Sequence, residues 1–266
     1  PNTTGAGTLA VNGATVNVND AIDLTLGGTS LSVSSGTLNA NGTLIAGAAT
    51  LSGGTLGGSG NVTVTGPLNV TGYSTLTGAG TLTTQGTTTV SLGVANGYVT
   101  LFGKTWVNEG ALTVGGDDYL WFGSGTNTLT NTATGTLNLS SSYATPLQNN
   151  STVTTVNNAG TLNHTATGTH SIDTGITFNN TGTVNVDAGA LQINGGGTDT
   201  GLYAVDAGTT VYFAGGTRNL NAGSNITGAG TLAVTGATVN VNDPIDPTLV
   251  GPSPISRSRP THPHGT

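Results

Sequence analysis

Half of the aromatic residues in this chain fall between positions 98 and 122. They are Tyr98, Phe102, Trp106, Tyr119, Trp121 and Phe122. Three carboxylates lie among them, at Glu109, Asp117 and Asp118. Aromatic rings offer flat apolar faces, and rings beside carboxylates suit the stacking and hydrogen bonding of sugars. The six rings are therefore candidates for ligand or inter-subunit contact, although we favour the alternative that they widen the hydrophobic core or pack against a neighbouring chain.

Several aspartates sit where turns are expected. They are Asp20 with Asp23, Asp243 with Asp246, the pair Asp117-Asp118, and Asp199 in the segment GGGTD. Ca²⁺ takes about six to eight oxygen ligands, and GGGTD faintly resembles a calcium-binding Gly-Asp repeat but occurs only once. Because Asp and Asn are favoured in turns for backbone reasons alone, we predict no cofactor, with Ca²⁺ at these acidic turns as the alternative.

Two histidines, His164 and His170, lie six positions apart with Asp173 nearby. A zinc site needs about four protein or water ligands, the chain has no Cys, and the other two His lie near its C-terminal end. We therefore predict no metal site and interpret the pair as surface histidines.

Catalytic groups are scarce. Glycoside hydrolysis requires two carboxyl groups at a defined separation, yet the chain holds one Glu, one Lys and only three Arg. No pair of aspartates is distinguished from the others by its spacing. We predict that the chain is not an enzyme, and a polysaccharide lyase or hydrolase is the less favoured alternative.

The composition excludes two other classes. Eleven acidic residues against four basic ones give a net charge of −7, so the chain lacks the basic stripe that nucleic-acid binding requires. No apolar run approaches the roughly 18 residues of a membrane span, so no membrane span is expected in this segment. Only 6% of the residues are charged and 45 are Gly, which directs attention to how the backbone is organised.

Short segments in which apolar or β-branched residues alternate with Thr, Asn or Ser recur along the chain, as at 14–18, 87–92 and 183–186. This period of two predicts half-buried strands, and the Gly-Gly and Asn-Gly pairs between them predict turns. No stretch shows the period of an amphipathic helix. The fold class is therefore predicted to be all-β.

A long repeat divides the chain. Residues 5–28 and 228–251 are identical at 20 of 24 positions. We interpret 1–223 as one repeat unit and 224–251 as the start of the next in a tandem-repeat array. Residues 252–266 follow as a degraded or irregular continuation that is expected to be poorly structured.

Three β architectures compete for this pattern. A sandwich array predicts a constant strand count with a buried Trp in each domain, and a propeller predicts blades of about 40–50 residues; neither pattern is present. A parallel β-solenoid suits short strands, tight Gly and Asn turns, and Thr and Asn side chains that stack on their own kind in successive coils. We predict a parallel β-solenoid of roughly 20 residues per coil.

The segment 179–241 carries the pattern G-[ST]-[LV]-x-[VN] together with N-x-G-[TS], and the first element recurs at Gly160-Thr161-Leu162 and Gly182-Thr183-Val184. This pattern covers most of residues 1–243 and resembles the repeats of giant bacterial extracellular proteins, the filamentous-haemagglutinin-like and autotransporter-like β-helix adhesins. The resemblance implies a right-handed parallel β-helix, export to the cell surface, and a structural or adhesive role.

These observations together predict an extracellular structural repeat that forms or coats a bacterial surface fibre by end-to-end stacking. The expected partners are copies of the chain itself, joined head to tail. The alternative is a surface adhesin or carbohydrate-binding module that contacts surface glycans through the aromatic residues at 98–122.

Overall fold

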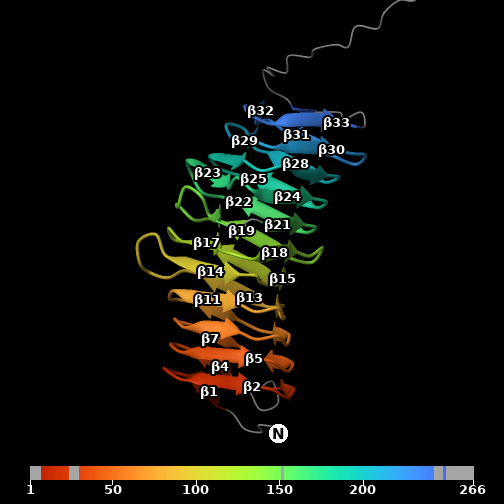
Figure 1. The fold of residues 1–266 in the computed structure, drawn as a ribbon. Coiled ribbons are helices and arrows are strands. Elements are labelled where there is room, and N and C mark those ends of the chain that lie inside the picture. The colour runs from red at the N-terminus through yellow and green to blue at the C-terminus, as the bar shows by residue number, and fades with distance from the viewer. Residues whose placement is uncertain (1–6, 24–29, 151–152, 243–247, 250–266) are drawn as a thin grey trace, which may run out of the picture.

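The computed structural model describes residues 7–23, 30–150, 153–242 and 248–249. Within these residues the chain forms three parallel sheets of 12, 11 and 11 strands and no helix. Each strand pairs with the third strand before it and the third strand after it. The chain therefore winds around one axis, contributing one strand to each sheet in every coil. The predicted parallel β-solenoid is confirmed, and Figure 1 shows its coils stacked from the N-terminal to the C-terminal end.

We call the three sheets A, B and C in the order in which the chain enters them. Sheet A contains β1 (Thr8–Val11), β4 (Ser30–Val33), β7 (Ala49–Leu51), β10 (Leu68–Val70), β13 (Thr87–Val90), β16 (Ala111–Val114), β19 (Thr136–Leu139), β22 (Thr161–His164), β25 (Thr183–Val186), β28 (Leu202–Val205), β31 (Asn225–Gly228) and β34 (Thr248–Leu249).

Sheet B contains β2 (Thr15–Val18), β5 (Thr37–Ala40), β8 (Thr55–Gly57), β11 (Ser74–Thr77), β14 (Tyr98–Phe102), β17 (Tyr119–Phe122), β20 (Leu147–Asn149), β23 (Thr169–Ile172), β26 (Ala190–Ile193), β29 (Thr210–Phe213) and β32 (Thr231–Val234). Sheet C contains β3 (Ile22–Asp23), β6 (Leu44–Ala46), β9 (Val62–Val64), β12 (Thr81–Thr84), β15 (Thr105–Asn108), β18 (Thr126–Asn131), β21 (Val153–Asn158), β24 (Ile176–Asn180), β27 (Gly197–Asp199), β30 (Thr217–Leu220) and β33 (Thr238–Val241).

Coil length varies along the solenoid. Leu31 pairs directly with Ala49, and Asn131 pairs directly with Asn158, so the second of these coils is half as long again as the first. The extra residues of the long coils enter the turns, such as the segment before β14 that projects from the stack in Figure 1. The strands keep their register because their apolar residues must remain on the inner face.

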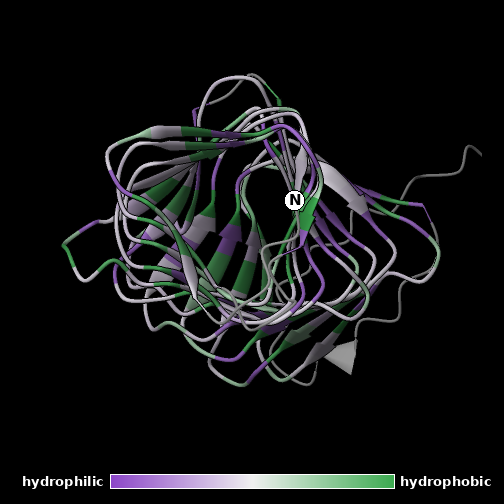
Figure 2. Ribbon diagram, turned by 90° about the horizontal axis from the view of Figure 1, so that it is seen from below, coloured by the Kyte–Doolittle hydropathy of each residue, from purple (hydrophilic) through white to green (hydrophobic). Residues whose placement is uncertain are grey.

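The core is the interior of the solenoid. In β5, β16 and β25 every second residue is buried, and the alternate residues are partly exposed. Because successive side chains of a strand point to opposite faces, the alternation in the sequence directs Leu, Val and Ile inward from all three sheets. Figure 2, seen along the axis, shows the three sheets around one common interior.

Glycine explains the motif that precedes the strands of sheet A. Gly135, Gly160, Gly182 and Gly201 occupy equivalent turns in successive coils, each just before a strand of sheet A. A Cβ atom on Gly160, Gly182 or Gly201 would collide with the carbonyl oxygen of the glycine one coil earlier. The backbones of stacked turns therefore approach too closely for any side chain, which accounts for the recurrent Gly-Thr-Leu and Gly-Thr-Val segments.

Candidate functional site

The six aromatic candidates separate into an outer and an inner group. They come from neighbouring coils, on β14 and β17 of sheet B and on β15 of sheet C. The side chains of Tyr98, Phe102, Tyr119 and Trp121 lie on the outer face of sheet B, where they are partly or largely exposed. Trp106 and Phe122 point inward and have no exposed surface.

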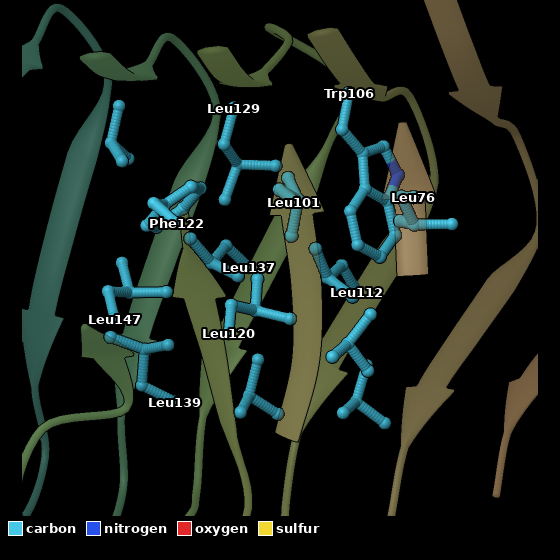
Figure 3. Packing of buried hydrophobic residues seen from close by; sticks show 14 of the residues in the cluster. Leu76, Leu101, Trp106, Leu112, Leu120, Phe122, Leu129, Leu137, Leu139 and Leu147 are labelled. Carbon is cyan, nitrogen blue, oxygen red and sulfur yellow. The ribbon is translucent and has the colours of Figure 1, made fainter. Parts of the chain in front are cut away.

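The two inner rings belong to the core. Figure 3 shows Trp106 and Phe122 among stacked leucines that include Leu101, Leu129 and Leu137. The indole Nε1 of Trp106 donates a hydrogen bond to Thr84 Oγ1 at 3.1 Å, so its one polar atom is satisfied inside the solenoid. Neither ring is accessible to a ligand or a second chain, and for these two residues the structure supports the core interpretation.

The outer rings form a continuous strip along the solenoid axis. Tyr98 contacts Tyr73, Tyr119 and Trp121, with ring centroids 4.9, 5.3 and 5.2 Å apart. Tyr119 stacks on Tyr143 with centroids 4.2 Å apart and an angle of 13° between the rings. We call these five residues, Tyr73, Tyr98, Tyr119, Trp121 and Tyr143, the aromatic strip. Aromatic pairs at such distances stabilise each other by about 0.5–1.5 kcal/mol each.

Two members of the strip, Tyr73 and Tyr143, fall outside the cluster of 98–122. Tyr73 precedes β11, which pairs with β14, and its side chain is 51% exposed. Tyr143 precedes β20, which pairs with β17. Each of these tyrosines therefore lies one coil away from a ring of the cluster. A search at the coil period, rather than for local density, could have found both from the sequence.

Phe102 flanks the strip at the end of β14 and is 38% exposed. Its ring covers Gly123, because a Cβ atom at that glycine would collide with the ring carbons of Phe102. The outer face of sheet B thus continues beyond Trp121 as an apolar surface.

The acidic residues near the strip have structural partners. Asp118 is buried, and its Oδ2 accepts the backbone N–H of Leu92 at 2.6 Å. Asp117 Oδ2 accepts the backbone N–H of Asn96 at 3.0 Å, and Asn96 has a positive φ of 53°. Burial raises the pKa of Asp118. These two carboxylates hold the segment 91–97 against the next coil, and Asp118 is too deeply buried to contact a ligand.

The strip itself carries no formal charge at neutral pH. Burial, followed by its tyrosine neighbours, raises the pKa of Tyr119 to about 12, so its hydroxyl remains protonated. Tyr143 donates its hydroxyl hydrogen to Gln148 Oε1 at 3.1 Å. The surface therefore offers flat rings and neutral hydroxyl groups, which suits a neutral ligand with apolar faces and hydrogen-bonding edges.

Asp199 belongs to a buried polar network and not to an open turn. Its carboxylate pairs with the guanidinium group of Arg218, whose Nε lies 3.0 Å from Asp199 Oδ2. The hydroxyl of Tyr203 donates to Asp199 Oδ1 at 2.9 Å, and all three side chains are fully buried. The rings of Phe178 and Phe213 lie 5.7 and 5.0 Å from the guanidinium carbon. A carboxylate enclosed in this way serves the core.

An internal ladder of asparagines leads toward this network. Asn108, Asn131, Asn158 and Asn180 occupy one inward column of sheet C, and all are buried. Each of the first three donates from Nδ2 to Oδ1 of the next at 2.8 Å. A polar column therefore runs through an apolar interior with its amides mutually satisfied, as buried polar groups must be.

The interpretation of His164 and His170 as surface residues is wrong. Both lie inside the solenoid, with 0% and 4% of their surface exposed. His164 Nδ1 is 2.9 Å from the carbonyl oxygen of Ala188, and His164 Nε2 is 3.2 Å from His170 Nδ1. Because a carbonyl can only accept, His164 carries its proton on Nδ1 and accepts the Nδ1–H of His170. Asp173 bonds instead to the backbone N–H groups of Asn149 and Thr174.

Among the described residues, no three His, Cys, Asp or Glu side chains gather in a way that could hold a metal ion. Asp243 and Asp246 lie outside the described residues. In the part of the chain that the structure covers, no helix has the length and apolar character needed to cross a bilayer. Comparisons with protein-family models, with curated proteins and with solved structures give no match.

Proposed function

We propose that this chain is a structural repeat of an extracellular fibre on a bacterial surface, assembled by end-to-end stacking of β-solenoids. The fold supplies the rigid rod, and the resemblance of the Gly-Thr-Leu and Asn-x-Gly segments to giant surface proteins supports the location. The proposal includes no catalytic step and no cofactor, with Ca²⁺ at the acidic turns as the alternative.

One observation carries the proposal: in the described part of the chain, the first and last coils of the stack carry apolar residues on strands that pair with a neighbour on one side only. Leu9, Val16 and Ile22 at the N-terminal end are only partly buried. At the other end Val234 and Val241 are 52% and 53% exposed, although inward valines of the middle coils are fully buried. Edge strands carry unpaired N–H and C=O groups that template further pairing, and a head-to-tail contact between unlike ends propagates without closing.

Electron microscopy and sedimentation of the purified chain over a range of concentrations test this proposal. We expect rods that lengthen with concentration and diffract with a spacing of about 4.8 Å along the axis. Leu9→Lys places a charge on the inner face of the end strand β1 and should keep the rods short. Ala10→Lys places the same charge on the outer face of the same strand and should leave assembly unchanged. Particles one chain long at all concentrations would contradict the proposal.

A second candidate function is glycan binding, and the aromatic strip specifically favours it. Five rings in contact along one outer face, without a charged group among them, form a surface on which a polysaccharide chain can stack. We expect Tyr98→Ala with Trp121→Ala to abolish binding to a panel of neutral glycans. Thr113→Ala with Asn138→Ala, on the outer face of sheet A, provides the matched control. Equal binding by both variants would refute this role.

A further inference from the structure

The sequence that occurs at both ends of the chain occupies different sheets at the two ends. The segment TLAV forms β1 in sheet A and, near the C-terminal end, β32 in sheet B. The segment TVNV forms β2 in sheet B and β33 in sheet C. In the described part of the chain, β32 follows β1 after ten full coils and one strand more. The second occurrence of the sequence therefore lies one sheet further around the solenoid axis than the first.

The outer asparagines give the two ends opposite hydrogen-bonding character. Asn39 Nδ2 donates to Asn17 Oδ1 at 2.9 Å, and Asn240 Nδ2 donates to Asn219 Oδ1 at 2.8 Å, so the later coil donates to the earlier one. Among the described residues, Nδ2 of Asn17 and Oδ1 of Asn240 have no partner. The N-terminal end thus presents an amide donor and the C-terminal end an amide acceptor.

A second pair repeats this arrangement. Asn41 Nδ2 donates to Asn19 Oδ1 at 2.9 Å, and Asn242 Nδ2 donates to Asn221 Oδ1 at 2.8 Å. Asn17 and Asn19 are the sequence equivalents of Asn240 and Asn242. The unused donors and acceptors at the two ends therefore have the same spacing along their strands.

We infer that a second copy of this chain docks on the C-terminal end turned by one sheet, so that its β1 lies on β32 and its β2 lies on β33. In this joint Leu9 lies over Leu232 and Val16 over Val239, which places like residues in each inner column. Asn17 Nδ2 then donates to Asn240 Oδ1 and continues the direction of every outer asparagine pair described above. This inference rests on the proposed end-to-end assembly and specifies its geometry.

The two other rotations leave these groups unmatched. Without rotation β2 lies on β32, and Asn17 then faces Ala233, which has no side-chain acceptor. With the opposite rotation β1 lies on β33, and Asn240 then faces Ala10. Both alternatives also bury apolar surface, so burial of the inner residues does not distinguish the three joints. The hydrogen bonds between the asparagine amides do distinguish them.

A consequence concerns the aromatic strip. Because each added copy is turned by one sheet, its aromatic strip lies on a different face of the fibre from the strip of the copy before it. The fourth copy returns to the orientation of the first. A fibre built in this way displays the strip on all three of its faces, so a ligand can be engaged around the whole circumference.

Cysteine pairing tests the rotation, since the chain has no Cys of its own. The outer threonines Thr8, Thr15, Thr231 and Thr238 begin the four end strands, and replacing them leaves the asparagines intact. Neighbouring strands lie about 4.8 Å apart, within the range of Cα separations that a disulfide spans. Single Cys variants of the full chain are mixed in pairs under mild oxidation, and the cross-linked dimers are counted on a non-reducing gel.

The inferred joint predicts cross-links between T8C and T231C and between T15C and T238C, each at about tenfold higher yield than the other mixtures. Preference for T15C with T231C would indicate an unrotated joint, and preference for T8C with T238C the opposite rotation. Either result overturns the inference while end-to-end assembly stands. Rods that form without any of these cross-links also overturn it, and absence of rods overturns assembly and joint together. T210C with T231C in one chain, directly paired in sheet B, is the positive control.

Discussion

Replacing His164 tests whether the buried histidine pair makes this solenoid sensitive to acid. The imidazole is fully buried and donates to the carbonyl of Ala188, while its second nitrogen accepts from His170. Burial, followed by the neighbouring His170, lowers the pKa of His164 from 6.5 to about 4. In the unfolded chain the same group titrates near its ordinary pKa, so the unfolded state binds a proton more readily than the folded state.

The sign and size of the effect follow from this difference. A lowered folded-state pKa gives full stability above the unfolded value of 6.5, and that stability is lost as the pH falls toward about 4. Each unit of pKa difference corresponds to about 1.4 kcal/mol, so the whole loss approaches about 3 kcal/mol. From about pH 7.5 to about pH 5, His164 alone should reduce the free energy of unfolding by about 2 kcal/mol.

Leucine is the matched replacement at this position. His164 lies between Leu139 and Val186 in its column of sheet A, so His164→Leu continues an apolar stack. We expect the free energy of unfolding of H164L, measured in urea, to fall by about 2 kcal/mol less than that of the parent chain over the same pH interval. The raised pKa values of Asp118, Asp187 and Asp199 act in the opposite direction and are common to both proteins.

A direct titration provides the second measurement. Nitrogen chemical shifts of the imidazole report both the pKa and the tautomer, and they do not require two-state unfolding, which long repeat arrays often lack. We expect a pKa of about 4 for His164, with the proton on Nδ1 in the neutral form. Parallel stability profiles for the two proteins, or an imidazole that titrates at its ordinary pKa, would refute the reasoning.

Three further substitutions probe the buried polar groups. Burial lowers the pKa of Lys104 to about 8, so Lys104→Met should raise the free energy of unfolding by about 2–3 kcal/mol at neutral pH. Thermal melts should show this gain in stability shrinking between about pH 8 and about pH 10.5, because the lysine of the parent chain becomes neutral over that interval. Asn131→Leu removes hydrogen bonds donated to three acceptors and should lower the free energy of unfolding by about 3 kcal/mol or more. Asn163→Leu, in an outer asparagine ladder, should lower it by under about 1 kcal/mol. Equal urea midpoints for the two variants would contradict the stabilising role of the inner ladder. Asp199→Asn leaves the charge of Arg218 buried without a counter-ion and should cost about 3–5 kcal/mol, and replacing both residues with apolar ones should recover much of that loss in the same denaturation assay.

Local pattern in the sequence was enough to predict the fold. Strands such as Thr183–Val186 alternate inward and outward residues, and this alternation alone identifies the buried face. The glycine before such a strand marks a turn. Gly182 is required at its turn because the backbone one coil earlier approaches too closely for a side chain. The scarcity of charge fits a solenoid because identical positions in successive coils lie about 4.8 Å apart.

The candidate site was only partly predictable. The cluster at 98–122 stands out as local density, but which rings face outward depends on the register of β14, β15 and β17. Tyr73 and Tyr143 join the strip only because coils of unequal length bring residues of successive coils side by side. The number of residues in each turn cannot be predicted from the sequence pattern.

The all-β class, the solenoid and the long repeat can be read directly from the chain, because they depend on period-two alternation, turn-forming residues and identity between 5–28 and 228–251. The sheet in which the second occurrence of the repeat lies cannot be read in this way, because it depends on the summed lengths of many unequal coils. Only the folded coils determine it. The same holds for the interior positions of His164 and Asp199, because burial of a polar side chain depends on partners such as Ala188 and Arg218 that the winding of the chain brings to it.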